Sequence, residues 1–91
     1  MQEFESPTYI LDFRNSLNRS TIESAKPNKE IWVLVRPEDD PSAESIAATG
    51  KRSEDGTEFH VVVVTTAGHQ SHTWNWSWLQ DAIGAYRDSW A

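Results

Sequence analysis

Three histidines, His60, His69 and His72, have side chains suited to both catalysis and metal binding. Three imidazoles can hold a zinc ion. His69 and His72 would need a helix to act as an i, i+3 pair, however, and Gly68 predicts a loop there. No carboxylate lies at a recognisable ligand spacing nearby. A small His-dependent enzyme or metal-binding domain is therefore only the third hypothesis for this chain.

Other catalytic patterns are missing from the sequence. There is no G-x-S-x-G turn, phosphate loop, dinucleotide fingerprint or H-E-x-x-H pair. The acidic run Glu38-Asp39-Asp40 lacks the spacing of a calcium loop. With no cysteine, thiol catalysis and disulfides are excluded. We expect no enzymatic activity, no cofactor and no bound metal.

Acidic residues are concentrated in one part of the chain. The net charge is −6, and residues 38–58 hold seven acidic residues against two basic ones. Direct binding to nucleic acid needs the opposite, a basic footprint. The alternatives are a solubilising loop region or an acidic face that meets a basic protein surface. For the second case the predicted partner-binding carboxylates are Glu38, Asp39, Asp40, Glu54, Asp55 and Glu58.

Tryptophan is the other unusual feature. The chain has five tryptophans, and Trp74, Trp76 and Trp78 alternate along the sequence. Such residues can cap a small core or act as interface anchors. Since five are many for one small core, we expect Trp74 or Trp76 to be partly exposed and to contact a partner.

The hypothesis favoured by these features is a small acidic protein-binding module. It would act as an inhibitor or regulator that occupies a basic surface of a larger protein, such as a nucleic-acid-binding channel, and so mimics nucleic acid. The alternative is a structural or assembly protein that forms homodimers through a Trp-rich surface. No apolar run approaches the length of a membrane span, and we expect a soluble, cytoplasmic protein without a membrane partner.

The length of 91 residues predicts one compact domain over residues 1–91. Ser6-Pro7 resembles a helix N-terminus, and Ile10, Phe13 and Leu17 follow at helical spacing, which favours an N-terminal helix. A strand over residues 8–13 is the competing interpretation. Ser20 and Glu23 match a capping box that could start a further short turn.

Two strands are expected in the middle of the chain. Residues 30–36, EIWVLVR, are β-branched and aromatic and should form a central strand covered on both faces. Residues 57–66, TEFHVVVVTT, should form the second strand, with Asp55-Gly56 as a two-residue hairpin turn. That turn would place Arg52 opposite Phe59. Residues 41–50 then favour a strand, although their composition also suits a helix.

The C-terminal part changes period. Residues 73–76 could form a short fourth strand, whereas Leu79, Ile83, Tyr86 and Trp90 form a helical stripe. Either Asn75 or Ser77 would cap that helix, so it should begin near residues 76–78. The expected fold is α+β: a small antiparallel meander of three or four strands, with an N-terminal helix and a C-terminal helix packed on one face.

Overall fold

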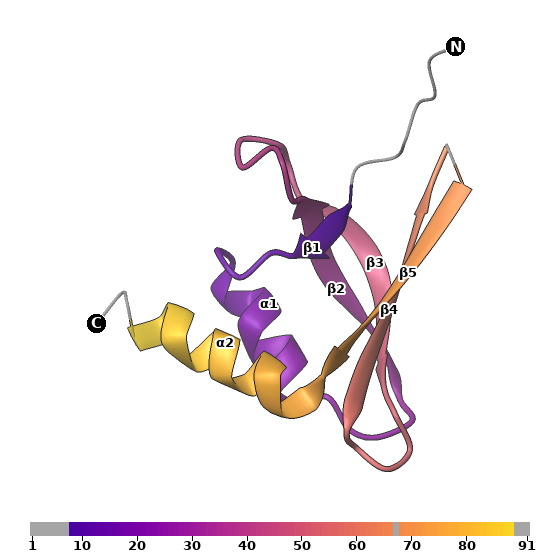
Figure 1. The fold of residues 1–91 in the computed structure, drawn as a ribbon, viewed down its shortest axis with the longest axis vertical. Helices are drawn as coiled ribbons and strands as arrows, with labels where there is room; N and C mark the ends of the chain where they lie inside the picture. The colour runs from indigo at the N-terminus through magenta and orange to yellow at the C-terminus, as the bar shows by residue number, and fades with distance from the viewer. Residues whose placement is uncertain (1–7, 67, 89–91) are drawn as a thin grey trace.

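The computed structural model describes residues 8–66 and 68–88, which form an α+β fold (Figure 1). These residues contain five strands and two helices, so the expected class is confirmed but three or four strands were too few. The elements in chain order are β1 (Tyr9–Leu11), α1 (Ser16–Glu23), β2 (Glu30–Pro37), β3 (Ile46–Arg52), β4 (Glu58–Thr65), β5 (Gly68–Asn75) and α2 (Trp76–Asp88). No helix within the described ranges is long and apolar enough to cross a bilayer.

The five strands form one antiparallel sheet in chain order, which confirms the predicted meander. The sheet is curled (Figure 1). Residues of its edge strands β1 and β5 line one small cavity together. Residues 46–52 are a strand, as favoured, and Arg52 pairs with Phe59 as predicted. The predicted hairpin register is therefore confirmed at that position.

The turn of that hairpin differs from the predicted two-residue form. Ser53 N–H donates to the Glu58 carbonyl at 2.8 Å, and Gly56 N–H donates to the Ser53 carbonyl at 2.9 Å. Gly56 has a φ of +78°, whereas Asp55 has no positive φ. Because a type I′ turn needs positive φ at both central residues, the strands are joined by a longer turn in which only Gly56 is left-handed.

The N-terminal helix was predicted in the wrong place. Tyr9–Leu11 form strand β1, which pairs with Val35–Pro37 of β2, and the competing strand interpretation was the better one. The helix begins at Ser16 because Asn15 caps it: Asn15 Oδ1 accepts hydrogen bonds from the Leu17 and Asn18 amides. Ser20 lies inside this helix and does not start a new one. The predicted cap Ser6-Pro7 lies outside the described residues.

Buried Asn18 joins α1 to the sheet where β1 ends. Its Nδ2 donates to the carbonyls of Asp12 and Leu34 at 2.8 and 3.1 Å. Its Oδ1 accepts from Leu34 N–H at 2.8 Å. The side-chain amide therefore satisfies both backbone groups of Leu34, as a neighbouring strand would. This clamp fixes α1 beside β2.

The core lies between the inner face of the sheet and the two helices. Strand residues Val33, Val61 and Phe59 share one buried cluster with Ile22 of α1 and with Leu79 and Ile83 of α2. The outer face is less covered: Trp32 of β2 is 70% exposed. The prediction that both faces of β2 are covered was therefore wrong, because both helices pack on the same side of the sheet.

Helix α2 begins at Trp76, within the predicted range. Trp78 N–H donates to Asn75 Oδ1 at 3.1 Å, so Asn75 rather than Ser77 is the N-cap. Leu79 and Ile83 are fully buried as the helical stripe predicted. Trp90, the last residue of that stripe, lies outside the described residues. Gly84 has open space where a Cβ would stand, so it marks no close packing.

Candidate functional site

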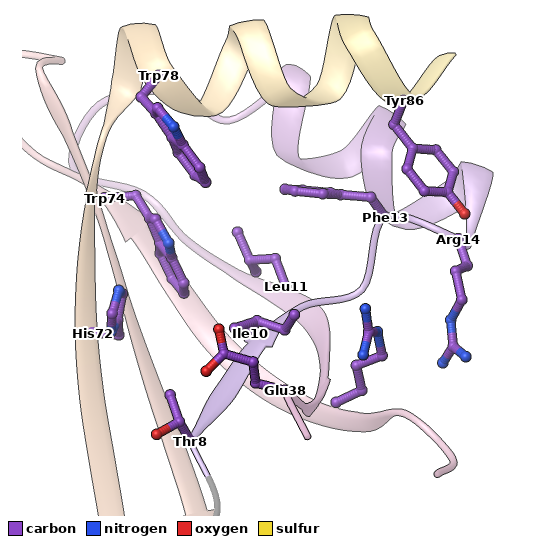
Figure 2. Close-up of a pocket in the computed structure, with 11 residues that line it drawn as sticks. Thr8, Ile10, Leu11, Phe13, Arg14, Glu38, His72, Trp74, Trp78 and Tyr86 are labelled. Carbon is purple, nitrogen blue, oxygen red and sulfur yellow. The ribbon is translucent and has the colours of Figure 1, made fainter. Parts of the chain in front are cut away.

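A groove of about 430 Å³ lies between α2, β5 and the β1 end of the sheet. Figure 2 shows side chains entering it from three directions: Trp78 and Tyr86 from α2, Trp74 and His72 from β5, and Ile10 and Phe13 from β1 and the residues after it. The lining residues are Thr8, Ile10, Leu11, Phe13, Arg14, Arg36, Glu38, His72, Trp74, Trp78 and Tyr86. A concave, largely aromatic surface with a few polar groups is typical of a binding site.

One wall of the groove is set by the junction of β5 and α2. His72 and Trp74 are two residues apart on β5 and therefore point to the same side. Their ring centroids lie 4.1 Å apart. The Asn75 cap then places Trp78 in the first turn of α2, where its side chain is 53% exposed. The wall thus offers a large aromatic surface that the protein itself only partly covers.

The opposite wall is formed by Phe13 and Tyr86. Phe13 is half-buried against the core. Tyr86, also half-buried, has the Arg19 guanidinium 5.2 Å from its ring centroid. Arg19 Nη1 also donates to the Phe13 carbonyl, so one arginine contacts both aromatic residues of this wall. That contact holds α1 against the C-terminal part of α2.

A buried carboxylate organises the polar end of the groove. Asp12 is 3% exposed and accepts from Arg14 Nε at 2.8 Å, from Arg14 Nη2 at 2.9 Å and from the Ser45 hydroxyl. The hydrogen bonds from Arg14 outweigh the cost of burial and lower the pKa of Asp12 to about 2. The same contact raises the pKa of Arg14.

Arg14 also connects the groove to the loop between β2 and β3. Its Nη1 donates to the Pro41 carbonyl at 2.5 Å, and its Nη2 lies 3.5 Å from the Ala43 carbonyl. Ser45 contacts Asp12 from the end of the same loop. The loop is therefore held at its middle and at its C-terminal end against the polar part of the groove.

Arg36 is the second arginine of the lining. Its Nε lies 4.0 Å from Asp12 Oδ1, and its Nη1 donates to the Pro37 carbonyl at 3.3 Å. The buried Nε has no hydrogen-bond partner among the described residues. The positive charges of Arg14 and Arg36 thus flank one buried carboxylate.

The predicted acidic residues do not form one face. Glu38 lines the groove, and Asp39 and Asp40 follow it in the β2–β3 loop. Glu54, Asp55 and Glu58 belong to the β3–β4 turn and the start of β4, at the other end of the sheet (Figure 1). A strand of seven residues separates the two groups. The fold therefore creates two acidic regions from one acidic stretch of sequence.

The predicted tryptophans also separate. Trp74 is half-buried and lines the groove next to Glu38, so the structure brings these two predicted residues to one site. Trp76 is 6% exposed, with the Phe59 ring centroid at 5.8 Å and the Arg52 guanidinium 4.1 Å above its ring. The expectation that Trp76 contacts a partner does not fit this position, because the α2 N-terminus turns it into the core.

Among the residues that the structure describes, the exposed tryptophans are Trp32 and Trp78, at 70% and 53%. Side chains alternate between the two faces of a strand. The outward position of Trp32 can therefore be predicted once one face of β2 is known to be open. The groove residues Phe13, Arg14, Arg36 and Tyr86 were not predicted. They come from three separate segments, the residues after β1, strand β2 and helix α2, which meet only in the folded chain.

The histidines lie on strands rather than in a loop. His60 faces Thr73 across β4 and β5, and its Nδ1 lies 2.7 Å from the Thr73 hydroxyl. His69 and His72 are both on β5, where an odd spacing places them on opposite faces. No group of three metal-ligating side chains occurs within the part of the chain that the structure describes.

In comparisons with known proteins, no protein-family model, curated protein or solved structure matched this chain.

Proposed function

We propose that this protein is a binding module whose site is the aromatic groove together with the acidic β2–β3 loop beside it. The partner is a protein segment that places an apolar side chain in the groove and a basic side chain next to the loop. One observation carries the proposal: Glu38 and Trp74, which are distant in sequence, line the same groove with half-exposed Trp78.

The groove offers the type of surface that anchors a partner. Binding energy at protein interfaces is concentrated in a few side chains, and tryptophan is enriched among them. Trp78 is 53% exposed in the free protein, so a partner can remove much of its apolar surface from water. Trp74 and Phe13 are already packed against the core and can receive a side chain without rearrangement.

The loop supplies the charge. Residues 38–44 contain Glu38, Asp39, Asp40 and Glu44 and no basic residue. No hydrogen bond or ion pair joins the side chain of Glu38 or Asp39 to another described residue. Their charge remains directed to solvent, where it would accelerate the approach of a basic partner. An inhibitor or regulator of a protein with a basic surface, acting in the cytoplasm, fits these properties.

A phage-displayed library of random peptides, panned on the immobilised protein, tests this function. We expect selected peptides to combine an aromatic or aliphatic residue with at least one Lys or Arg. Their affinity should fall as NaCl rises from about 50 mM to about 500 mM, because exposed charges are screened. Selection of no peptide, or of acidic peptides, would contradict the proposal.

Matched variants locate the site. We expect Trp78→Ala to weaken binding of a selected peptide about tenfold or more. The control is Trp32→Ala, which removes an equally large exposed ring from the outer face of the sheet. For charge, the double reversal Glu38→Lys with Asp39→Lys should weaken binding more than Glu54→Lys with Glu58→Lys, which changes the net charge equally. If the two tryptophan variants weakened peptide binding equally, or if the two double reversals did, the groove end would not be the site.

A further inference from the structure

Strand β5 is an edge strand without the usual protection. It pairs with β4 over its full length of eight residues, and no strand of the described chain pairs with its other side. Its sequence, GHQSHTWN, has no Lys, Arg, Asp, Glu or Pro. Natural sheets normally protect an edge of this length with charge, proline or a bulge, because a free edge accepts another strand.

The backbone groups that face the free side of β5 follow from its pairing with β4. Trp76 N–H donates to the Thr57 carbonyl at 2.8 Å, which makes that pair hydrogen-bonded. Hydrogen-bonded and non-hydrogen-bonded pairs alternate along an antiparallel ladder. Ser71 and Thr73, paired with Val62 and His60, are therefore non-hydrogen-bonded toward β4. Their N–H and C=O groups point to the free edge.

This free edge leads into the groove. Between β1 and β5 lies a cavity of about 30 Å³, with Tyr9 on one side, Gln70 and Ser71 on the other and Val35 and Val61 beneath. The cavity and the groove share His72 and Trp74 of β5. A chain that runs along β5 therefore reaches the aromatic groove without leaving the strand.

We propose that the partner segment binds as an added strand on the free edge of β5. This mode of recognition rests on the function proposed above and specifies how the partner segment binds. The main chain of the segment pairs with Ser71 and Thr73, and alternate side chains face the inner side of the sheet. One apolar side chain enters the groove against Trp74 and Trp78, and a basic one lies near Glu38. The occupant is thus an extended, basic and apolar segment of another protein.

A second copy of the chain is a less suitable occupant. Each copy carries a net charge of −6, and the β2–β3 loop adjoins the groove. Two copies paired through β5 would bring these charges together, whereas a basic segment neutralises them. Self-pairing is nevertheless an outcome that the experiment can detect.

The test compares Ser71→Pro with Ser71→Ala, using a synthetic copy of a display-selected peptide as the probe. Proline removes the N–H that faces the free edge but no hydrogen bond to β4, a position at which sheets tolerate it. Alanine removes only the hydroxyl. We expect the proline variant to bind the peptide at least tenfold more weakly than the alanine variant, with similar melting temperatures. Sedimentation of the free wild-type protein should show a monomer.

Hydrogen exchange provides a second readout that needs no variant to fold. We expect the amides of Ser71 and Thr73 to gain protection when the peptide binds. N-methylation of successive peptide residues should weaken binding at alternate positions. Equal binding by the two Ser71 variants, or no gain in protection, would overturn strand addition. A dimer of the free protein that Ser71→Pro dissociates would overturn the basic segment as the occupant, because a second copy would then pair with the edge. If the peptide still binds and Trp78→Ala still weakens it, the proposed function survives; no binding by wild type would refute the function itself.

Discussion

The two ends of the sheet are both acidic and are each organised by one aspartate with a pKa of about 2, Asp12 at the groove and Asp55 in the β3–β4 turn. The means differ. Asp12 is buried and depends mainly on the hydrogen bonds and charge of Arg14. Asp55 is exposed and accepts only neutral donors: the Ser53 hydroxyl first, then the Thr57 amide and hydroxyl.

This difference shows how one acidic composition serves two purposes. At the turn, the carboxylate closes on its own neighbours and shapes four or five residues of local chain. At the groove, Asp12 binds Arg14 and Ser45, which hold a loop whose Glu38 and Asp39 stay directed to solvent. At the turn, the carboxylate is satisfied by hydrogen bonds from its own neighbours. The groove end instead presents charge beside an apolar surface. A partner should therefore distinguish them although their charges are similar.

Among the variants that test this comparison, Asp12→Asn should lower the free energy of unfolding the most. The variant loses the ion pair with Arg14 and leaves Arg36 beside a neutral group. Asp12 has a folded pKa of about 2 against an ordinary 3.8. A depressed folded pKa stabilises the protein above the unfolded pKa, and this contribution is lost as pH falls from about 4 to about 2. The variant should lose about 2 kcal/mol of unfolding free energy at pH 7.

Urea unfolding at pH 7 and at pH 2 measures that loss. Wild type and Asp12→Asn should differ at pH 7 and approach each other near pH 2, where about half of the wild-type carboxyl groups are protonated. A constant difference across this range would mean that packing rather than the ion pair holds the groove end together.

An intermediate effect is expected at the other end from Gly56→Val. Gly56 has a φ of +78°, and a Cβ there would lie 3.2 Å from Arg52 Nη2. Arg52 donates to the Gly56 carbonyl and stacks on Trp76. The left-handed backbone conformation costs a residue with a Cβ about 1–2 kcal/mol, so the variant should unfold at a lower urea concentration than wild type.

Gly84→Ala serves as the control for glycine replacement. Gly84 lies in α2 with open space around its Cβ position, and alanine should stabilise the helix by about 1 kcal/mol. If Gly56→Val were as stable as wild type, the β3–β4 turn would not be a locally defined unit.

The sequence predicts those parts of the fold whose signals are local. The β-branched runs of β2 and β4 and the Asp55-Gly56 pair predict two strands and the position of Arg52 opposite Phe59. The candidate caps Asn75 and Ser77 predict the start of α2, and Asn75 is the cap that forms. In each case adjacent residues favour one conformation.

The parts that were missed depend on contacts between distant segments. Tyr9–Leu11 suit a helix or a strand equally, and the edge of β2 decides between them. In α1 only Asn18 and Ile22 are buried, and Asn18 is positioned by Leu34. Trp74 could be predicted as a candidate from its residue type, whereas the meeting of Phe13, Arg36 and Tyr86 depends on how α2 packs against the β1 end of the sheet.

The smallest effect should come from Asp55→Asn. Its amide oxygen can still accept from Ser53 or Thr57, so the turn keeps its shape, and only the stronger acceptance by a carboxylate is lost. Because Asp55 is exposed, water replaces much of that interaction. The melting temperature at pH 7 should fall less than in Asp12→Asn, and the difference from wild type should shrink between pH 4 and pH 2, since the folded pKa is again about 2. Thermal melts across this range measure both. A larger fall than in Asp12→Asn would reverse the comparison, because the turn rather than the groove would then hold the more strongly stabilising carboxylate.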